Sequence, residues 1–387
     1  MTEQQRSTAA TEAVTAGRSV NDGALSAPLW TNVVWEAGDA STAAAQAHAV
    51  RPDRFYGRYG NPTVTAFTDA IATLEHAEAA LAFGSGMGAL ATTVFALCSS
   101  GDHVVASDRC YAGTRALLDG PAARLGITTT WVDATTPGAV AAAVIPGQTM
   151  LVIVETPSNP LLDLVDLNEI GNITGPFTMV DSTFATPLGQ RPLDYGIDLV
   201  MHSATKGIAG HNDVTMGVVA GERELIDTIW GYSTIHGATP SPFDAMLALR
   251  GLRTLDVRHE RQSATALHLA HRLQSHSGVT AVHYPLLETH PRAELAARQM
   301  TRGGSLLSFE LAEDRYGAFI DALSLIRCAT SLGGPETIVC QPSTTTHAHL
   351  SVDDRLAIGI SERLVRMSVG LEHVEDLWDD VSRALAS

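Results

Sequence analysis

The chain has 387 residues, enough for two or three domains and a large core. Hydrophobic residues make up 45% and charged residues 17% of the sequence, which is ordinary for a soluble globular enzyme. The formal net charge of −17 argues against nucleic acid or an anionic membrane surface as the main partner. No stretch has the length and purity of a transmembrane helix, so we expect no membrane-spanning segment.

The cysteines and the N-terminus indicate a cytoplasmic protein. Cys98, Cys110, Cys328 and Cys340 show no paired short spacing of the zinc or redox kind, and they are too few for a disulfide framework. Residues 1–6 lead into Ser, Thr and Ala without an apolar signal core, which predicts a mobile cytosolic tail.

The order of patterns along the chain predicts an α/β fold. The stretch before about residue 62 lacks regular apolar periodicity and predicts an extended arm. Strand and helix patterns alternate after it, which is typical of βαβ units and a mostly parallel sheet. The expected helices are 67–80, 89–97, 114–125, 255–273 and 374–385. The expected strands are 103–106, 150–155, 177–181, 199–203, 217–220, 306–310 and 364–369.

The segment Thr239-Pro240-Ser241-Pro242 predicts a domain boundary. Beyond it, a long amphipathic helix with charge on one face leads into short strands and helices that indicate a smaller α+β domain. The sequence therefore predicts an N-terminal arm (1–60), a large domain (61–245) and a C-terminal domain (246–387).

Polar residues end two of the buried strands. Asp181 follows one apolar run, and Ser203, Thr205 and Lys206 follow the next. Ligands of parallel α/β sheets bind outside the carboxyl ends of the strands. A lysine and an aspartate arriving there suit pyridoxal 5'-phosphate (PLP), whose aldehyde forms a Schiff base with lysine and whose pyridinium nitrogen pairs with a carboxylate. By itself, Lys206 is also compatible with a lysine that leaves the sheet for solvent.

Two loops are candidate phosphate sites. The loop around Gly86 and Met87 precedes a helix, where small residues and free N–H groups attract phosphate, although a tight turn explains it equally well. It is neither a dinucleotide fingerprint nor a P-loop. Tyr56 and Arg58 lie in a second loop, and the donor fork of an arginine matches phosphate oxygens, although a surface arginine would show the same spacing.

Two further residues favour an amino-acid substrate on a planar cofactor. Tyr111 follows a strand and is placed to stack on a planar ring, or else is an ordinary core tyrosine. Arg366 lies inside a short apolar strand, where either a substrate carboxylate or a structural ion pair must balance its charge. Among the 15 histidines, His268 and His271 share a helical face, but no ligand completes a metal site and we expect them to be solvated.

Several motifs occur in order from about Tyr56 to the C-terminus. They are Tyr56-x-Arg58-x-x-Asn61-Pro62-Thr63, Ser85-Gly86-Met87, Glu155-Thr156-Pro157-Ser158-Asn159-Pro160, Asp181-Ser182-Thr183-Phe184-Ala185-Thr186-Pro187, His202-Ser203-Ala204-Thr205-Lys206, Ser331-Leu332-Gly333-Gly334 and Arg363-Leu364-Val365-Arg366-Met367-Ser368-Val369-Gly370-Leu371-Glu372. Together they resemble the Cys/Met-metabolism PLP enzymes, the cystathionine γ-synthase and methionine γ-lyase family. The resemblance implies a fold-type I, aspartate-aminotransferase-like subunit in a homotetramer whose active sites are shared between subunits.

The same resemblance implies a role for each motif residue. The implied cofactor contacts are Tyr56 and Arg58 from the neighbouring subunit, with Gly86, Met87, Tyr111, Asn159, Asp181, Ser203, Thr205 and Lys206 within the subunit. The implied catalytic residues are Lys206, Tyr111 and Asp181, and the implied substrate-binding residues are Ser331, Arg366, Asn159 and Tyr56.

The implied reaction is γ-elimination or γ-replacement on a homoserine- or homocysteine-derived amino acid, such as an O-acylhomoserine, cystathionine or a methionine-like substrate. Lys206 forms the internal aldimine and later moves protons. The alternatives are β-elimination of cystathionine or cysteine, γ-substitution with an unusual nucleophile, and a non-catalytic PLP-binding protein.

The chain departs from the family pattern at several positions. Gly113 stands where methionine γ-lyases typically carry a cysteine, and Thr330 stands where cystathionine enzymes often carry a glutamate facing the distal amino group. Gly207 replaces the usual tyrosine after the lysine, and the segment 341–347 is unusual. These departures predict an unusual substrate or nucleophile.

Overall fold

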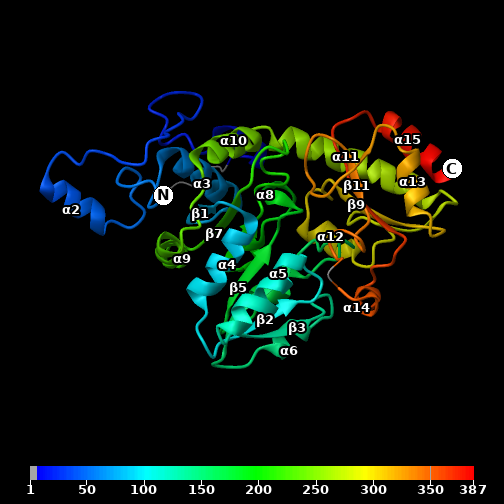
Figure 1. Cartoon of the computed structure of the whole chain (residues 1–387), viewed down its shortest axis with the longest axis horizontal. Helices are drawn as coiled ribbons and strands as arrows, with labels where there is room; N and C mark the ends of the chain where they lie inside the picture. Colours follow the sequence, from blue (N-terminus) through cyan, green and yellow to red (C-terminus); the bar gives the residue numbers. More distant parts are fainter. Residues whose placement is uncertain (1–6, 349) are drawn as a thin grey trace.

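The computed structural model describes residues 7–348 and 350–387, which form two sheets flanked by helices (Figure 1). The larger sheet has the strand order β1-β7-β6-β5-β4-β2-β3. Strands β2 to β6 run parallel, and β7 is antiparallel to both β6 and β1. The strands are β1 (Ala79–Phe83), β2 (His103–Ser107), β3 (Thr128–Val132), β4 (Thr149–Glu155), β5 (Phe177–Asp181), β6 (Leu199–His202) and β7 (Gly217–Gly221).

Helices cover both faces of this sheet, as a mostly parallel sheet of continuous apolar strands requires. The helices are α3 (Pro62–Glu75), α4 (Gly86–Leu97), α5 (Ala112–Leu117), α6 (Ala139–Ala143), α7 (Leu167–Gly171), α8 (Thr186–Gly189), α9 (Arg223–His236) and α10 (Pro242–Leu252), and α11 (Leu255–Gln274) leads from α10 to the second sheet. A π-helical turn (Leu118–Ala122) follows α5, and a 3₁₀ turn (Pro192–Tyr195) precedes β6. Helices α4 and α9 pack on one face, and α3 and α10 pack on the other.

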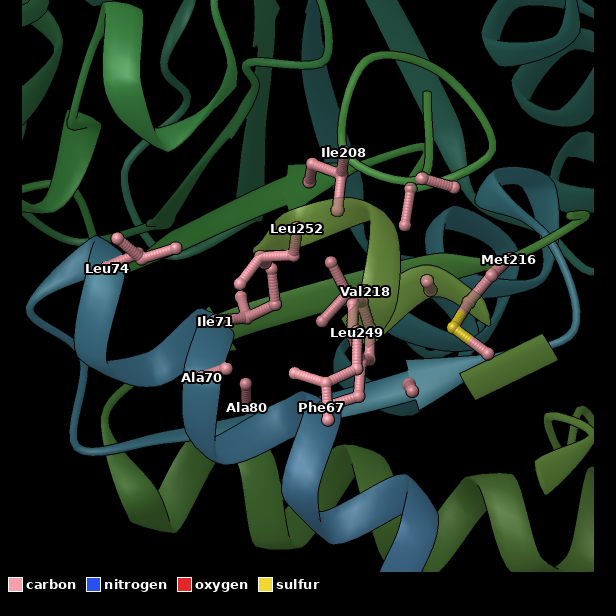
Figure 2. Packing of buried hydrophobic residues seen from close by; sticks show 14 of the residues in the cluster. Phe67, Ala70, Ile71, Leu74, Ala80, Ile208, Met216, Val218, Leu249 and Leu252 are labelled. Atoms are coloured by element: carbon pink, nitrogen blue, oxygen red, sulfur yellow. The ribbon is translucent and has the colours of Figure 1, made fainter. Parts of the chain in front are cut away.

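The packing of α3 shows how one face is buried (Figure 2). Phe67, Ile71 and Leu74 recur along the helix with helical spacing and point at the sheet. They meet Val218 of β7 and Leu249 of α10 in one cluster of buried residues. This cluster supports β6 and β7, and the Lys206 loop follows β6 in the chain.

The C-terminal region forms a second sheet of order β10-β11-β12-β9-β8, antiparallel except for the β10–β11 pair. Its strands are β8 (Val279–His283), β9 (Leu306–Leu311), β10 (Arg327–Cys328), β11 (Ile338–Cys340) and β12 (Leu364–Ser368). Its helices are α12 (Ala293–Gln299), α13 (Tyr316–Ala322), α14 (Val352–Ala357) and α15 (Val374–Ala386). The boundary predicted between residues 245 and 246 lies inside α10.

The helix predicted over residues 67–80 needs correction. The helix expected over 67–80 begins at Pro62 and ends at Glu75, because His76 adopts a left-handed conformation (φ 57°). Ala79 and Ala80 instead belong to β1, where the apolar run pairs with Gly221 and its neighbours. An alanine-rich run has no periodicity that separates helix from strand, so the sheet partner decides.

The arm is less extended than the sequence predicts. It contains two short helices: α1 (Ala9–Thr15), whose Ala13 is buried in the cluster with α3, and α2 (Ala40–His48), which projects away from both sheets (Figure 1). The mobile tail predicted for residues 1–6 lies outside the described residues. In the described part of the chain, no helix combines the length and apolarity needed to cross a membrane.

Candidate active site

The carboxyl ends of β4, β5 and β6 meet at one edge of the large sheet. Glu155 ends β4 opposite Asp181, which ends β5, and Asp181 is paired in turn with Met201 of β6. The chain then leaves β6 through Ser203 to Lys206. Because these strands are parallel, their polar ends gather where such sheets bind ligands.

A cavity of about 350 Å³ lies at this edge. Most of the predicted site residues line it, namely Gly86, Met87, Tyr111, Asn159, Asp181, Ser203, Thr205, Lys206, Ser331 and Arg366. Residues that the sequence analysis did not single out also line it, among them Glu155, Thr183 and Thr346. Residues from both sheets therefore share one cavity.

One end of the cavity can hold an anion. Ser85 caps α4 by accepting a hydrogen bond from Gly88 N (2.9 Å), and the first-turn N–H groups of Gly86 and Met87 have no intrahelical acceptor. A Cβ at Gly86 would lie 2.9 Å from the Cβ of Ser203, so only glycine permits this close approach. The Ser203 hydroxyl has no partner among the described residues, whereas Thr205 Oγ1 donates to Met216 O (3.2 Å).

The Lys206 amine points across the cavity toward the C-terminal domain. Its Nζ donates to Ser331 Oγ at 2.8 Å. Burial, and then the nearby charge of Arg366, lowers the pKa of Lys206 below its ordinary value. Because the Lys206 side chain lines the cavity, it is not a lysine that leaves the sheet for solvent.

Asp181 presents one free carboxylate oxygen. Its Oδ1 accepts hydrogen bonds from Thr183 N (3.0 Å) and Thr183 Oγ1 (2.5 Å), and its Oδ2 makes none to the described residues. Burial raises the pKa of Asp181, while the Thr183 hydrogen bonds and the nearby His202 oppose the rise. A cationic N–H donor placed at Oδ2 would favour the ionised form.

Glu155 is a site residue to which the sequence analysis assigned no role. Its Oε2 accepts from Tyr111 N at 2.6 Å, and its Oε1 accepts from Asn159 N at 2.9 Å. Burial first, and then the charge of Asp181, raises the pKa of Glu155 well above its ordinary value. The signal in the sequence was a carboxylate at the end of an apolar strand, the same signal that identified Asp181.

Arg366 is buried in β12, and its guanidinium forms no ion pair with the described residues. Nη1 donates to Asn159 Oδ1 (2.9 Å) and Nη2 donates to Ser331 O (3.1 Å). No carboxylate of the described residues lies within 4.0 Å of it. The structural ion pair considered for Arg366 is therefore absent there, and a substrate carboxylate remains the fitting partner.

Tyr111 is 45% exposed, so it is not a core tyrosine.

The family model of Cys/Met metabolism PLP-dependent enzymes matches residues 10–386. The chain belongs to this family. It is 42% identical to an O-succinylhomoserine sulfhydrylase from Pseudomonas aeruginosa, over 97% of this chain and 95% of that protein. It is 38% identical to an L-methionine gamma-lyase from Fusobacterium nucleatum, over 99% of each. A crystal structure of cystathionine gamma synthase from Xanthomonas oryzae with aminoacrylate and cysteine matches with TM-score 0.92 at 38% identity, covering 98% of each chain.

These comparisons confirm the predicted family, fold class and cofactor of this PLP-dependent enzyme. The residues present also fit PLP on their own chemistry. The cavity offers an amine at Lys206, a free carboxylate oxygen at Asp181 and an anion cradle at the start of α4. In the described residues, no group of three or more His, Cys, Asp or Glu side chains is arranged for a metal ion, and His268 and His271 are exposed.

Tyr56 and Arg58 lie outside the cavity of their own subunit. Nη1 of Arg58 donates to Thr234 O, and its guanidinium lies 5.1 Å from the ring centroid of Tyr59. In the described residues the two therefore line no part of the Lys206 cavity. Their predicted role toward a neighbouring subunit stays a prediction.

The departures from the family pattern fall in different places. Thr330 lines the cavity. Gly113 lies under the Tyr111 ring, where a Cβ would come within 2.5 Å of Cε1. The backbone of Gly207 packs against Gly333, whose added Cβ would lie 2.5 Å from Gly207 N.

Proposed function

We propose that the enzyme catalyses γ-replacement on an O-acylated homoserine, with hydrosulfide or another small thiol nucleophile that carries no amino group. The broader class predicted from the sequence, γ-elimination or γ-replacement, is supported by the sulfhydrylase and gamma-lyase names of its relatives. The narrower choice of substrate and nucleophile is our inference from the cavity.

The observation that carries this choice is the character of the cavity wall formed by residues 330–332 and 346. Thr330, Thr346 and Leu332 contribute neutral side chains there. Among the described lining residues, the only carboxylates are Glu155 and Asp181, both at the strand ends. Cysteine or cystathionine would bring a second ammonium group without a carboxylate to receive it, and an unpaired buried charge is costly. Hydrosulfide brings no such group.

The chain's own residues would orient the substrate and move its protons. Arg366 and Ser331 would hold the α-carboxylate by a charge-assisted contact. Lys206, with its lowered pKa, has a larger neutral fraction near neutral pH than a free lysine and can therefore accept protons from carbon. Bound PLP supplies the electron sink that stabilises negative charge on the substrate carbons. In the net reaction the Cγ–O bond breaks, the acyl group leaves as a carboxylate, and a Cγ–S bond forms with hydrosulfide.

Product analysis tests this proposal. The enzyme is incubated with O-acetyl- or O-succinylhomoserine, alone, with sulfide or with cysteine. We expect homocysteine with sulfide, little cystathionine with cysteine, and slow release of 2-oxobutyrate without a nucleophile. Preferential formation of cystathionine would refute the choice of nucleophile, and pyruvate would refute γ-chemistry in favour of β-elimination.

We also propose that the enzyme is a homotetramer in which Tyr56 and Arg58 complete the cavity of a neighbouring subunit. Apolar side chains on the arm and beside it support this, since Leu25 is 78% and Ile235 is 88% exposed. Large apolar side chains that one chain leaves exposed are available for a second chain to cover. Val34 and Phe243 are also exposed near these segments.

Mixing inactive variants tests the shared site. Arg58→Ala and Lys206→Ala subunits are each inactive in this scheme, but a mixed dimer contains one cavity with both native residues. Random exchange should restore roughly 25% of wild-type activity, because half the dimers are mixed and half their sites are native. No recovery after exchange has been confirmed by mass spectrometry would contradict the shared site.

A further inference from the structure

Helix α11 joins the cores of the two domains. Leu255, in its first turn, belongs to the cluster formed with α3 and α10, whereas Leu269 and Leu273 belong to the cluster of the C-terminal sheet. Figure 1 shows the helix running from α10 toward α13 and α15. Arg258 and Gln262 lie between these two anchors, one turn apart on one face. They are 4% and 2% exposed, respectively.

Arg258 is a buried cation that holds main-chain carbonyls. Nη1 donates to Gly207 O (2.9 Å), Nη2 donates to Ile208 O (3.2 Å) and Gly251 O (2.7 Å), and Nε donates to Thr254 Oγ1 (3.1 Å). No carboxylate of the described residues pairs with it. Two of the acceptors, the carbonyls of Gly207 and Ile208, directly follow Lys206 in the chain. The guanidinium therefore holds the backbone that carries the lysine, and we call this arrangement the clamp.

The clamp has a steric counterpart in Gly210. This residue has φ +68°, and a Cβ there would lie 1.9 Å from Nη1 of Arg258. The loop can close over the guanidinium only because position 210 has no side chain. Burial lowers the pKa of Arg258 to about 10, so it is still charged at neutral pH.

Gln262 holds the loop on the other side of the cavity. Its Nε2 donates to Gly334 O at 2.8 Å. This loop begins at Ser331, whose Oγ accepts the hydrogen bond from Lys206. Gly333 packs directly on Gly207, as described above. The lysine loop and the Ser331 loop are therefore in contact with each other, and both are hydrogen-bonded to the same helix.

We propose that Arg258 and Gln262 are positioning residues, through which α11 sets the relative placement of Lys206 and the Ser331 loop across the domain boundary. A merely structural arginine would be expected to pair with a carboxylate, because an unpaired buried cation is costly to retain. Here its fork is matched to two successive carbonyls behind the lysine, a geometry that lysine cannot reproduce. This inference rests on the roles proposed above for Lys206 and Ser331.

The two residues should affect different kinetic constants. Arg258 supports the amine that moves protons, so its loss should lower kcat. Gln262 supports the loop that receives the substrate carboxylate, so its loss should raise KM. A purely structural role would lower stability without this division.

The experiment compares Arg258→Lys and Gln262→Met with two matched controls in the PLP-loaded enzyme. Arg302 lies outside α11 but binds Asp256 of that helix, and Arg302→Lys alters this contact. Gln299→Met alters a buried glutamine that donates to Val165 O (3.0 Å). Melting temperature, kcat, KM for O-acetylhomoserine with sulfide, and the intensity of the visible cofactor band are measured at fixed pH.

We expect Arg258→Lys to lower kcat by about 10²-fold with KM within about threefold, because misplacement by about 1 Å costs that much. It should also change the intensity of the visible band. Gln262→Met should raise KM about tenfold with kcat little changed. Both controls should stay within about twofold of wild type in both constants.

Either of two results would overturn the inference. In the first, Arg258→Lys and Gln262→Met lose as much melting temperature as the controls and have the same kinetic constants and visible band as the controls. In the second, each of the two variants changes kcat and KM to the same extent, so that the expected division between them is absent. If Arg258→Lys does not fold, Gly210→Ala displaces the same guanidinium while keeping its charge and should show the same pattern. If the wild-type enzyme forms no homocysteine, the proposed reaction fails, whereas the cofactor band still decides the role of Arg258.

Discussion

Replacing Glu155 with glutamine tests whether one carboxylate organises the cofactor side of the cavity. Glutamine has the same size but offers one oxygen and one NH₂ group. Either Tyr111 N or Asn159 N would then lose its acceptor, whichever way the amide turns. Both segments carry side chains that line the cavity, so the change should displace at least one of them.

The magnitude follows from two opposing effects. Losing a hydrogen bond costs about 0.5–1.5 kcal/mol, or about 1.5–3 kcal/mol where the acceptor is charged, and an N–H left buried without an acceptor costs about 1–3 kcal/mol more. Against this, burial and the charge of Asp181 already disfavour the ionised carboxylate that the substitution removes, as the raised pKa of Glu155 shows. We therefore expect a net loss of about 1–3 kcal/mol in the free energy of unfolding. A displaced Tyr111 or Asn159 should lower kcat/KM by about 10²-fold.

Urea unfolding and steady-state kinetics measure the two effects separately. Glu155→Asp is a useful companion, because it keeps the charge but shortens the reach to the two N–H groups. Asp380→Asn is the matched control, since Asp380 also accepts main-chain hydrogen bonds, from Ser324 N (2.9 Å) and Ile326 N (2.9 Å), but lies in the C-terminal domain away from the cavity. It should lose stability while kcat/KM per folded enzyme stays within about twofold.

The reasoning would be refuted if Glu155→Gln behaved like the control. That result is a loss of stability with kcat/KM and PLP affinity close to wild type. Full activity in Glu155→Asp together with loss in Glu155→Gln would show instead that the charge, and not the double hydrogen bond, is what matters.

Three further predictions address stability, cofactor attachment and the tyrosine ring. Burial lowers the pKa of His259 to about 3, so below about pH 6.5 the unfolded chain binds a proton that the folded chain does not. The free energy of unfolding should therefore fall by about 2 kcal/mol between pH 7 and pH 5 from this residue, and urea titrations should show that much less pH dependence in His259→Leu. Lys206→Ala should abolish the visible absorption band while PLP remains dialysable, and persistence of the band would contradict the covalent link. Gly113→Ala places a Cβ within 2.5 Å of the Tyr111 ring and should lower kcat/KM by about tenfold, whereas Gly231→Ala, with no atom within 4 Å, should leave it unchanged.

The strand ends were predictable from sequence because each carries its own local signal. An apolar run that stops at a carboxylate or at hydroxyls indicates a buried strand with a polar mouth, and parallel pairing brings such mouths together. That reasoning located Asp181 and Lys206, and the same signal was present at Glu155. Arg366 followed from the cost of a charge inside an apolar strand. None of these inferences required long-range information.

Arg258 and His259 show where local patterns stop being informative. In an amphipathic helix with many charged residues, both fit a solvated face, yet the structure buries them between the domains. What buries Arg258 is the approach of the lysine loop from over 40 residues earlier in the chain, permitted by Gly210, whereas His259 packs beside Gly189. A helical pattern records which residues share a face, but it does not record which loop will cover that face.

The same limit explains why the cofactor was easier to predict than the substrate. The residues that fit PLP lie mostly at strand ends, where local sequence and parallel pairing suffice to predict them. The wall that we propose distinguishes nucleophiles is built from the Thr330 and Thr346 loops of the C-terminal domain, and α11 links that domain to Lys206. If α11 sets this placement, substitutions at Arg258 or Gln262 should change the ratio of replacement to elimination without altering any residue that touches the substrate. The yield of homocysteine relative to 2-oxobutyrate in those variants measures this directly, and an unchanged ratio would confine α11 to a structural role.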